Sequence, residues 1–98
     1  MGVLIVQHGD TATEHADTFY AGNIVHREEA PHPGLEIDDE YASHWHALFS
    51  PRLDGWTVED AGSTNGTWLN GEKIYGARKL AKGDKVRIGR TELTVVPT

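Results

Sequence analysis

The sequence has no cysteine among its 98 residues, so disulfides and thiolate metal sites are excluded. Long apolar runs are also missing. The longest, residues 3–6 and 93–96, are far shorter than the roughly 20 residues that a membrane-spanning helix needs. The first residues have neither the basic start nor the apolar stretch of a secretory signal. We therefore expect a cytoplasmic protein that makes no membrane contact.

Positive charge is scarce as well. Nine Lys and Arg stand against fifteen Asp and Glu, which gives a formal net charge of −6. A nucleic-acid-binding protein needs net or strongly localised positive charge to release counterions from phosphates. The sequence contains no run of Lys and Arg of that kind, so nucleic acid is not expected as a partner.

Helical periodicity is absent too, since no stretch of 11 or more residues keeps an apolar spacing of 3.6. Short β-branched or alternating segments take its place, and they are separated by turn signals such as Gly9-Asp10, Asn70-Gly71 and Gly89-Arg90. The expected strands lie within residues 3–7, 17–27 (two strands), 35–37, 45–49, 56–60, 68–69, 73–74, 84–88 and 93–95. Many short strands at this spacing predict one all-β domain over residues 1–98, either a sandwich or a barrel.

Six histidines raise the question of a metal site. His44 and His46 would point to the same face of a strand, but a metal needs a third and usually a fourth ligand, and no second paired spacing occurs. A hydrolase built on Ser43, a neighbouring histidine and an aspartate is the other chemical alternative. The strand-to-helix Gly-x-Ser-x-Gly turn of such enzymes is missing. We expect no catalysis and no cofactor, and a His-based metal site remains the less favoured alternative.

A loop of small residues, 61–66, is suited to holding a peptide. It lacks the lysine and the following helix of a nucleotide-binding loop. The side chain of Asn65, in contrast, offers one acceptor and two donors to a peptide backbone.

Several motifs occur together in a fixed order: Ser-His-Trp-His at residues 43–46, Gly-Ser-Thr-Asn-Gly at 62–66, Leu-Asn-Gly at 69–71, and Gly-Asp and Ile-Gly at 83–84 and 88–89. In order and spacing this combination resembles the forkhead-associated (FHA) family over about residues 24–96. The resemblance implies a sandwich of two twisted antiparallel sheets with the binding loops at one end. It also implies recognition of a phosphothreonine peptide from a partner protein, as an adaptor beside a Ser/Thr kinase or its substrate.

The resemblance assigns roles to nine residues. Six would contact the phosphopeptide: Arg27, Ser43, His44, Thr64, Asn65 and Asn70. Three would support the binding loops: His46, Gly62 and Gly66. A guanidinium such as that of Arg27 offers forked donors to phosphate oxygens and stays charged at any working pH. Asn70 could contact the peptide or could simply make its own hairpin turn.

Two positions depart from the family pattern. His26 stands where a glycine normally precedes the phosphate-binding arginine, and His44 stands where the family often has Arg or Lys. A histidine is strained in a backbone conformation that only glycine adopts readily, so at His26 either the loop differs from that of the family or Arg27 is displaced. A neutral imidazole attracts phosphate less than a permanent cation does, so His44 predicts weaker and more pH-sensitive phosphate binding. An FHA-like domain that binds protein independently of phosphate is the alternative.

Overall fold

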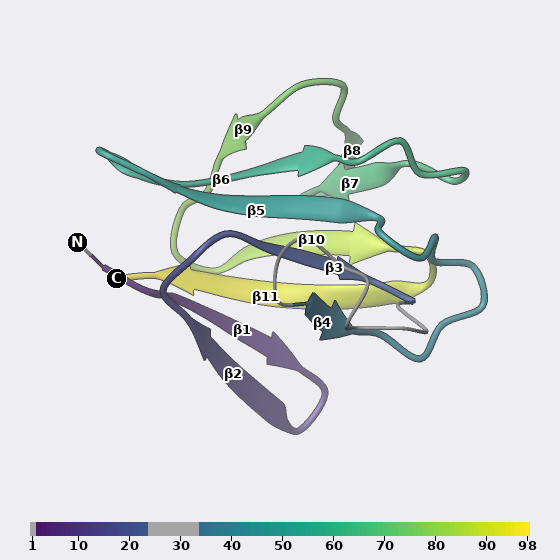
Figure 1. Ribbon diagram of the computed structural model, residues 1–98, viewed down its shortest axis with the longest axis horizontal. Coiled ribbons are helices and arrows are strands. Elements are labelled where there is room, and N and C mark those ends of the chain that lie inside the picture. Colours follow the sequence, from purple (N-terminus) through teal and green to yellow (C-terminus); the bar gives the residue numbers. More distant parts are fainter. Residues whose placement is uncertain (1, 24–33) are drawn as a thin grey trace.

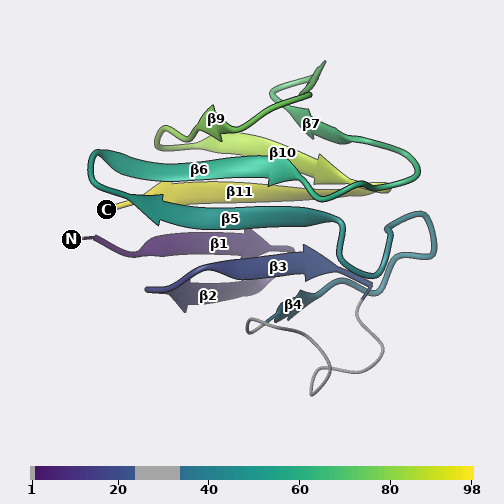
Figure 2. The ribbon, with the colours of Figure 1, turned by 45° about the horizontal axis from the view of Figure 1, so that its top comes forward.

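The computed structural model describes residues 2–23 and 34–98, and within them the chain forms two β-sheets that pack face to face (Figures 1 and 2). One sheet has the order β2-β1-β11-β10-β7-β8 and the other β4-β3-β5-β6-β9. The strands of the first are β1 (Leu4–His8), β2 (Thr11–His15), β7 (Thr67–Leu69), β8 (Glu72–Lys73), β10 (Asp84–Ile88) and β11 (Thr91–Pro97). Those of the second are β3 (Phe19–Gly22), β4 (Gly34–Glu36), β5 (Ala47–Arg52), β6 (Gly55–Asp60) and β9 (Arg78–Lys79).

The predicted all-β sandwich is confirmed. Its sheets are antiparallel at every described pairing except one, since β4 lies parallel to β3 with Ala21 opposite Leu35. A parallel neighbour requires a long connection instead of a tight turn, and residues 23–33 supply that length.

Alternation of apolar and polar residues explains how each sheet presents one face to the core. In β10, Val86 and Ile88 are buried while Lys85 and Arg87 are exposed. Phe19 and Phe49, on neighbouring strands of the other sheet, stack with ring centroids 4.9 Å apart. The buried core includes aromatic and aliphatic side chains from both sheets: Phe49, Trp56, Val58, Val86, Ile88, Leu93 and Val95.

Two strands were missed by the sequence interpretation. β2 is polar and half exposed, so it carries no apolar alternation, yet it pairs with β1 along its whole length as an edge strand. β9 is only two residues long and lies within the segment 76–83, which was expected to be a connection. Of the two strands expected within residues 17–27, β3 is one, and residues 24–27 lie outside the described residues. The turn between β5 and β6 is tight, because β5 continues to Arg52 and β6 begins at Gly55.

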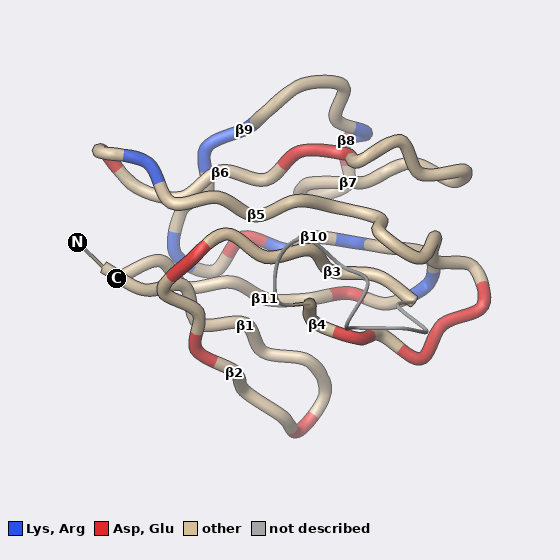
Figure 3. The backbone as a smooth tube through the Cα atoms, in the orientation of Figure 1, with Lys and Arg blue, Asp and Glu red and all other residues tan. Residues whose placement is uncertain are grey.

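The two ends of the sandwich differ in character (Figure 1). One end holds both termini and the β5–β6 turn, and the other holds the loops that follow β6 and β10. Charge is uneven too: Lys and Arg are concentrated on β8, β9 and β10, whereas Asp and Glu follow β4 (Figure 3). In the part of the chain that the structure describes, no helix is long and apolar enough to cross a membrane.

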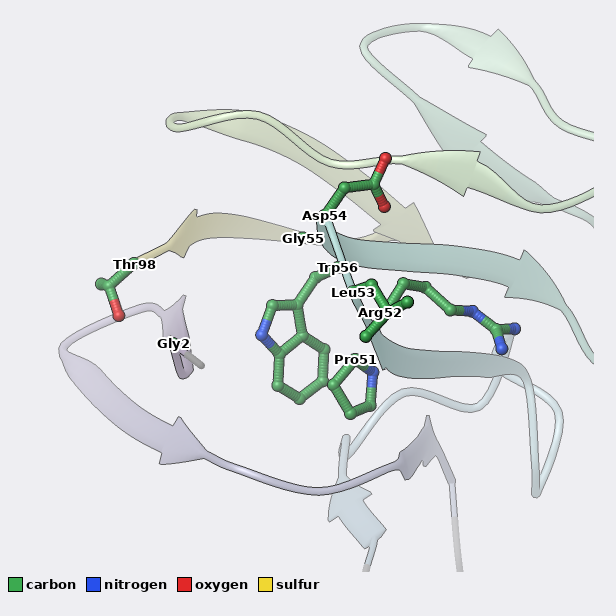
Figure 4. A pocket seen from close by; sticks show the side chains of 8 residues that line it. All are labelled: Gly2, Pro51, Arg52, Leu53, Asp54, Gly55, Trp56 and Thr98. Carbon is green, nitrogen blue, oxygen red and sulfur yellow. The ribbon is translucent and has the colours of Figure 1, made fainter.

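A surface pocket lies at the end with the termini (Figure 4). It is lined by the β5–β6 turn, by Trp56 and by Gly2 and Thr98 from the two ends of the chain. None of the nine residues expected to bind or support a peptide lines this pocket.

Candidate functional site

A buried histidine joins the two loops that the sequence singled out. His46 is fully buried, and its Nδ1 accepts a hydrogen bond of 3.0 Å from the backbone amide of Ser43. The proton must therefore be on Nε2, which donates to the carbonyl oxygen of Gly66 at 2.7 Å. One imidazole thus fixes the 43–46 loop internally and ties it to the 63–66 loop.

The loops also contact each other directly. The amide of Thr64 donates to the hydroxyl oxygen of Ser43 at 3.1 Å, which places these two predicted contact residues side by side. The side-chain amide of Asn65 donates to the carbonyl oxygen of Tyr41 at 2.8 Å. The first bond joins the two loops, and the second joins the 63–66 loop to the segment just before the 43–46 loop.

Asp60, at the end of β6, shapes the 61–66 loop from inside. Its carboxylate accepts hydrogen bonds from the amides of Gly62 and Ser63 and from the hydroxyls of Ser63 and Thr67. The Ser63 oxygen in turn accepts from the amide of Gly66 at 2.9 Å. Partial burial disfavours the charged form of Asp60, but the hydrogen bonds outweigh it, so the pKa of this carboxyl lies below its ordinary value. Gly62 and Gly66 have φ of 85° and 86°, a region that residues with a Cβ rarely adopt.

Gly22, at the end of β3, lets the 43–46 loop pack directly on the backbone of that strand. A Cβ at this position would lie 2.3 Å from the carbonyl oxygen of His44 and 2.6 Å from that of Ser43. The close approach is held by two backbone bonds, from the amide of His46 to Ala21 and from that of Asn23 to Ser43. Any side chain at residue 22 would push the loop away.

The turn between β10 and β11 joins the same end of the sandwich through bonds to Asp39. Its carboxylate accepts from the amide of Tyr41 at 2.8 Å, and from the amide of Arg90 and the hydroxyl of Thr91, both at 2.7 Å. Burial opposes ionisation of Asp39, but these bonds prevail and the pKa of the carboxyl is lowered. The guanidinium of Arg90 lies over the ring of Tyr41, 4.0 Å from its centroid.

The inward bonds leave specific groups facing solvent. His44, Thr64 and Asn65 are exposed and Ser43 is half-buried. The Ser43 oxygen accepts the Thr64 amide, so its own proton is free to be donated. Among the described residues, no group is hydrogen-bonded to the Thr64 hydroxyl or to Oδ1 of Asn65. This surface therefore offers a hydroxyl donor beside a backbone-binding amide.

Two of the predicted contacts are placed differently or not at all. Asn70 is in the left-handed region with φ of 50°, and its side chain bonds the carboxylate of Asp84 and the amide of Lys85. Its polar atoms thus join the β7–β8 hairpin to β10. Arg27, together with His26 before it, lies outside the described residues.

The geometry does not favour the two chemical alternatives, a metal site and a hydrolase. Both ring nitrogens of His46 are engaged in hydrogen bonds, which leaves neither for a metal. Across residues 2–23 and 34–98, no group of three or more His, Cys, Asp or Glu could hold an ion. For a hydrolase, His46 would have to bond the Ser43 hydroxyl, but it bonds the Ser43 amide instead.

Four residues that position the loops were not identified from sequence: Gly22, Asp39, Tyr41 and Asp60. Asp60 had a local signal, because an aspartate before Ala-Gly-Ser is typical of a turn in which the side chain accepts the amides that follow. The other three contact residues that are distant in the chain, although Asp39 also accepts the nearby amide of Tyr41.

Comparison with known proteins identifies relatives of this chain. The FHA domain-containing protein FhaB of Mycolicibacterium smegmatis is 49% identical over 63 residues, which are 64% of this chain and 41% of that protein. The glycogen accumulation regulator GarA of Mycobacterium tuberculosis is 42% identical over 64 residues, 63% of this chain and 39% of that protein. The chain thus spans about two fifths of the length of these relatives.

Solved structures agree in fold. The FHA domain of an Arabidopsis thaliana hypothetical protein superposes with a TM-score of 0.85 at 24% identity, covering 98% of this chain and 86% of its own. A structure from a study of phosphothreonine-dependent FHA domain interactions gives a TM-score of 0.80 at 22% identity, covering 96% and 95%. The family model for the FHA domain matches residues 14–89. This chain therefore belongs to the FHA domain family, a family of non-catalytic, phosphothreonine-dependent interaction domains.

Proposed function

We propose that this domain binds a phosphothreonine in an extended segment of a partner protein and releases it unchanged. The observation that carries the proposal is the contact between the two loops, where the Thr64 amide bonds the Ser43 hydroxyl oxygen at 3.1 Å. A group that donates to phosphate and a group that grips a peptide backbone are thereby held next to each other.

The phosphate side consists of Ser43, His44 and Arg27. The free proton of the Ser43 hydroxyl is one donor, and the exposed imidazole of His44 stands beside it in the same loop. The Arg27 guanidinium is the only permanent cation of the three and supplies paired donors to phosphate oxygens. We assign it the largest share of the phosphate affinity.

The peptide side consists of Thr64 and Asn65. Nδ2 of Asn65 is held by Tyr41, which orients Oδ1 without using it. An oriented amide oxygen accepts a backbone N–H at little entropic cost, because the side chain is already fixed. The free Thr64 hydroxyl lies one residue away and meets the phosphothreonine itself.

The partner we propose is a cytoplasmic protein phosphorylated by a Ser/Thr kinase, or the kinase itself. A regulator among the relatives and the phosphothreonine-dependent interactions studied in a structural neighbour support a signalling role without catalysis. In this proposal residues 1–98 act as one binding module, and no cofactor takes part.

Binding of a threonine peptide library, phosphorylated and unphosphorylated, measured by fluorescence anisotropy, tests the proposal. We expect binding of the phosphorylated forms only, and a loss of at least about tenfold in Arg27→Ala, the cost of removing a charged donor from a phosphate. Arg52→Ala is the matched control, since Arg52 is exposed at the end with the termini. Equal binding of both peptide forms would instead establish the phosphate-independent domain that His26 and His44 suggest.

The pH dependence isolates His44. Only the protonated imidazole is a cation, so a contact between His44 and phosphate should make affinity fall as pH rises, once the titration of phosphate itself is subtracted. His44→Ala should remove that dependence. A flat profile in the wild type means that His44 does not contact phosphate.

A further inference from the structure

Beside the binding loops, the outer face of the six-stranded sheet carries a row of cationic and aromatic side chains. The pairing register places Arg87 of β10 opposite Trp68 of β7, and Trp68 opposite Lys73 of β8. Arg87 and Lys73 are exposed and Trp68 is half-buried, whereas the adjacent Thr67 and Leu69 face the core. We call Lys73, Trp68 and Arg87, together with Tyr75 after β8, the cationic row.

Each cation in the row rests on an aromatic ring. The Arg87 guanidinium is 4.8 Å from the centroid of Trp68, and the Lys73 ammonium is 5.7 Å from that of Tyr75, which is 87% exposed. Within the described residues, neither cation has a carboxylate at ion-pair distance. Their charges are therefore held in place but not neutralised.

The charge around the row is opposite to that of the chain. Seven of the nine basic residues lie in residues 72–92 together with three acidic ones, although the net charge of the whole chain is −6. One of the three, Glu92 of β11, lies opposite Arg87. Lys73, Lys85 and Arg87 lie on β8 and β10, in the same sheet as Trp68 (Figure 3). The basic residues of β9 belong to the other sheet. A surface of this sign attracts an acidic ligand and repels the acidic remainder of other copies of the chain.

The row begins at the peptide-binding loop. The side chain of Lys73 lies against Gly66, so closely that a Cβ there would be 2.7 Å from Cε and 3.5 Å from Nζ of the lysine. Gly66 directly follows Asn65, to which we assign the grip on the peptide backbone. A peptide leaving Asn65 on this side therefore meets the Lys73 ammonium first.

We propose that the cationic row binds an acidic segment of the same phosphorylated partner, adjacent to its phosphothreonine. This inference rests on the proposed function and adds a preference to it. Neighbouring strands are about 4.8 Å apart, so the distance from Lys73 across Trp68 to Arg87 is about 10 Å, which matches about three residues of an extended peptide. Two or three Asp or Glu within that length would face the two cations, while apolar parts of the peptide would cover Trp68.

A protein segment suits this surface better than a nucleic acid. Two aromatic-supported cations cover only a short stretch, and the net charge of −6 on the whole chain disfavours binding of a duplex. An acidic peptide can stay within the row.

Phosphothreonine peptides that share a core sequence test the inference. Each carries a three-residue extension, either Asp/Glu or Ser/Gly, and each extension is tried before and after the phosphothreonine. We expect the acidic extension on one side to tighten binding by about two- to tenfold at low salt, the range for two exposed ion pairs, and the gain to shrink as salt rises. Lys73→Gln/Arg87→Gln should abolish the gain and leave the Ser/Gly peptide unaffected. Arg78→Gln/Lys82→Gln, which removes two charges outside the row, should preserve it.

The outcomes separate the two proposals. If neither phosphopeptide binds, the proposed function is overturned, and this inference with it. Binding of both with equal affinity, or an equal loss for both in the double variant, overturns the inference alone. In amide NMR spectra the indole N–H of Trp68 should shift with the acidic peptide and not with the Ser/Gly peptide. Displacement of the acidic extension by an equal charge of duplex DNA would mark a general polyanion surface and would also overturn it.

Discussion

Replacement of His46 by alanine should damage stability and binding together. The imidazole is fully buried and makes two hydrogen bonds, one within the 43–46 loop and one across to the 63–66 loop. Alanine removes both bonds and leaves a space the size of the ring between the loops.

The cost can be worked out from the two partners. The Gly66 carbonyl lies on a buried residue and would lose its imidazole donor, at about 1–3 kcal/mol. The Ser43 amide is on a half-buried residue, where water can replace the imidazole, so its loss is at the lower end of that range. Lost packing of the ring adds about 1–2 kcal/mol. Together these losses predict a fall of about 3–6 kcal/mol, a large part of the 5–15 kcal/mol that folded domains typically have.

Urea denaturation followed by the fluorescence of buried Trp56 measures this change. His44→Ala is the control, because His44 is exposed two residues away, and it should change the free energy of unfolding by less than about 0.5 kcal/mol. A loss below about 1 kcal/mol in His46→Ala would refute the reasoning, since it would mean that the loops hold each other without the imidazole.

Three further changes probe the other supports of the site. Asp60→Asn should lower the free energy of unfolding by about 1–2 kcal/mol at pH 7. The pKa of Asp60 in the folded state lies below the unfolded value of 3.8, so this contribution is complete above pH 3.8 and is lost as pH falls through the folded pKa. The stabilities of the two proteins, measured by urea denaturation, should therefore converge in acid. Gly22→Ala should destabilise the domain by about 1–3 kcal/mol through overpacking against the 43–46 loop, whereas Gly76→Ala, with open space around it, should not; equal melting curves would contradict this. Asn65→Ala should weaken phosphopeptide binding at least about tenfold in anisotropy with less than about 1 kcal/mol of stability lost, and unchanged affinity would remove Asn65 from the peptide grip.

The parts of this fold that can be predicted from sequence are those with a local pattern. β10 alternates buried and exposed residues and was placed at its observed bounds. The Asn70-Gly71 hairpin was found because both residues tolerate positive φ, and both have it. β2 has no such pattern, since an edge strand with one pairing partner and a polar face gives up the alternation that identifies a strand.

The candidate site divides in the same way. Ser43, His46, Thr64 and Asn65 were expected in two loops, and the structure brings those loops into contact. Gly22 could not be recognised, because its requirement is the approach of a loop more than twenty residues away and not a backbone angle of its own. Asp39 is hidden for the same reason, since its partners Arg90 and Thr91 are 51 and 52 residues further along the chain.

The polar groups of the site are separated by direction. His46, Asp39 and Asp60 point inward and accept or donate bonds that fix backbone, while the free atoms of Ser43, Thr64 and Asn65 point outward. A binding surface made of short side chains needs such support, because serine and threonine cannot reach far to correct a misplaced loop. Loss of an inward residue should therefore lower stability and affinity in proportion, whereas loss of an outward one should lower affinity alone. Asn65 belongs to both groups through its two amide ends, so it links the frame of the loop to the grip on the peptide.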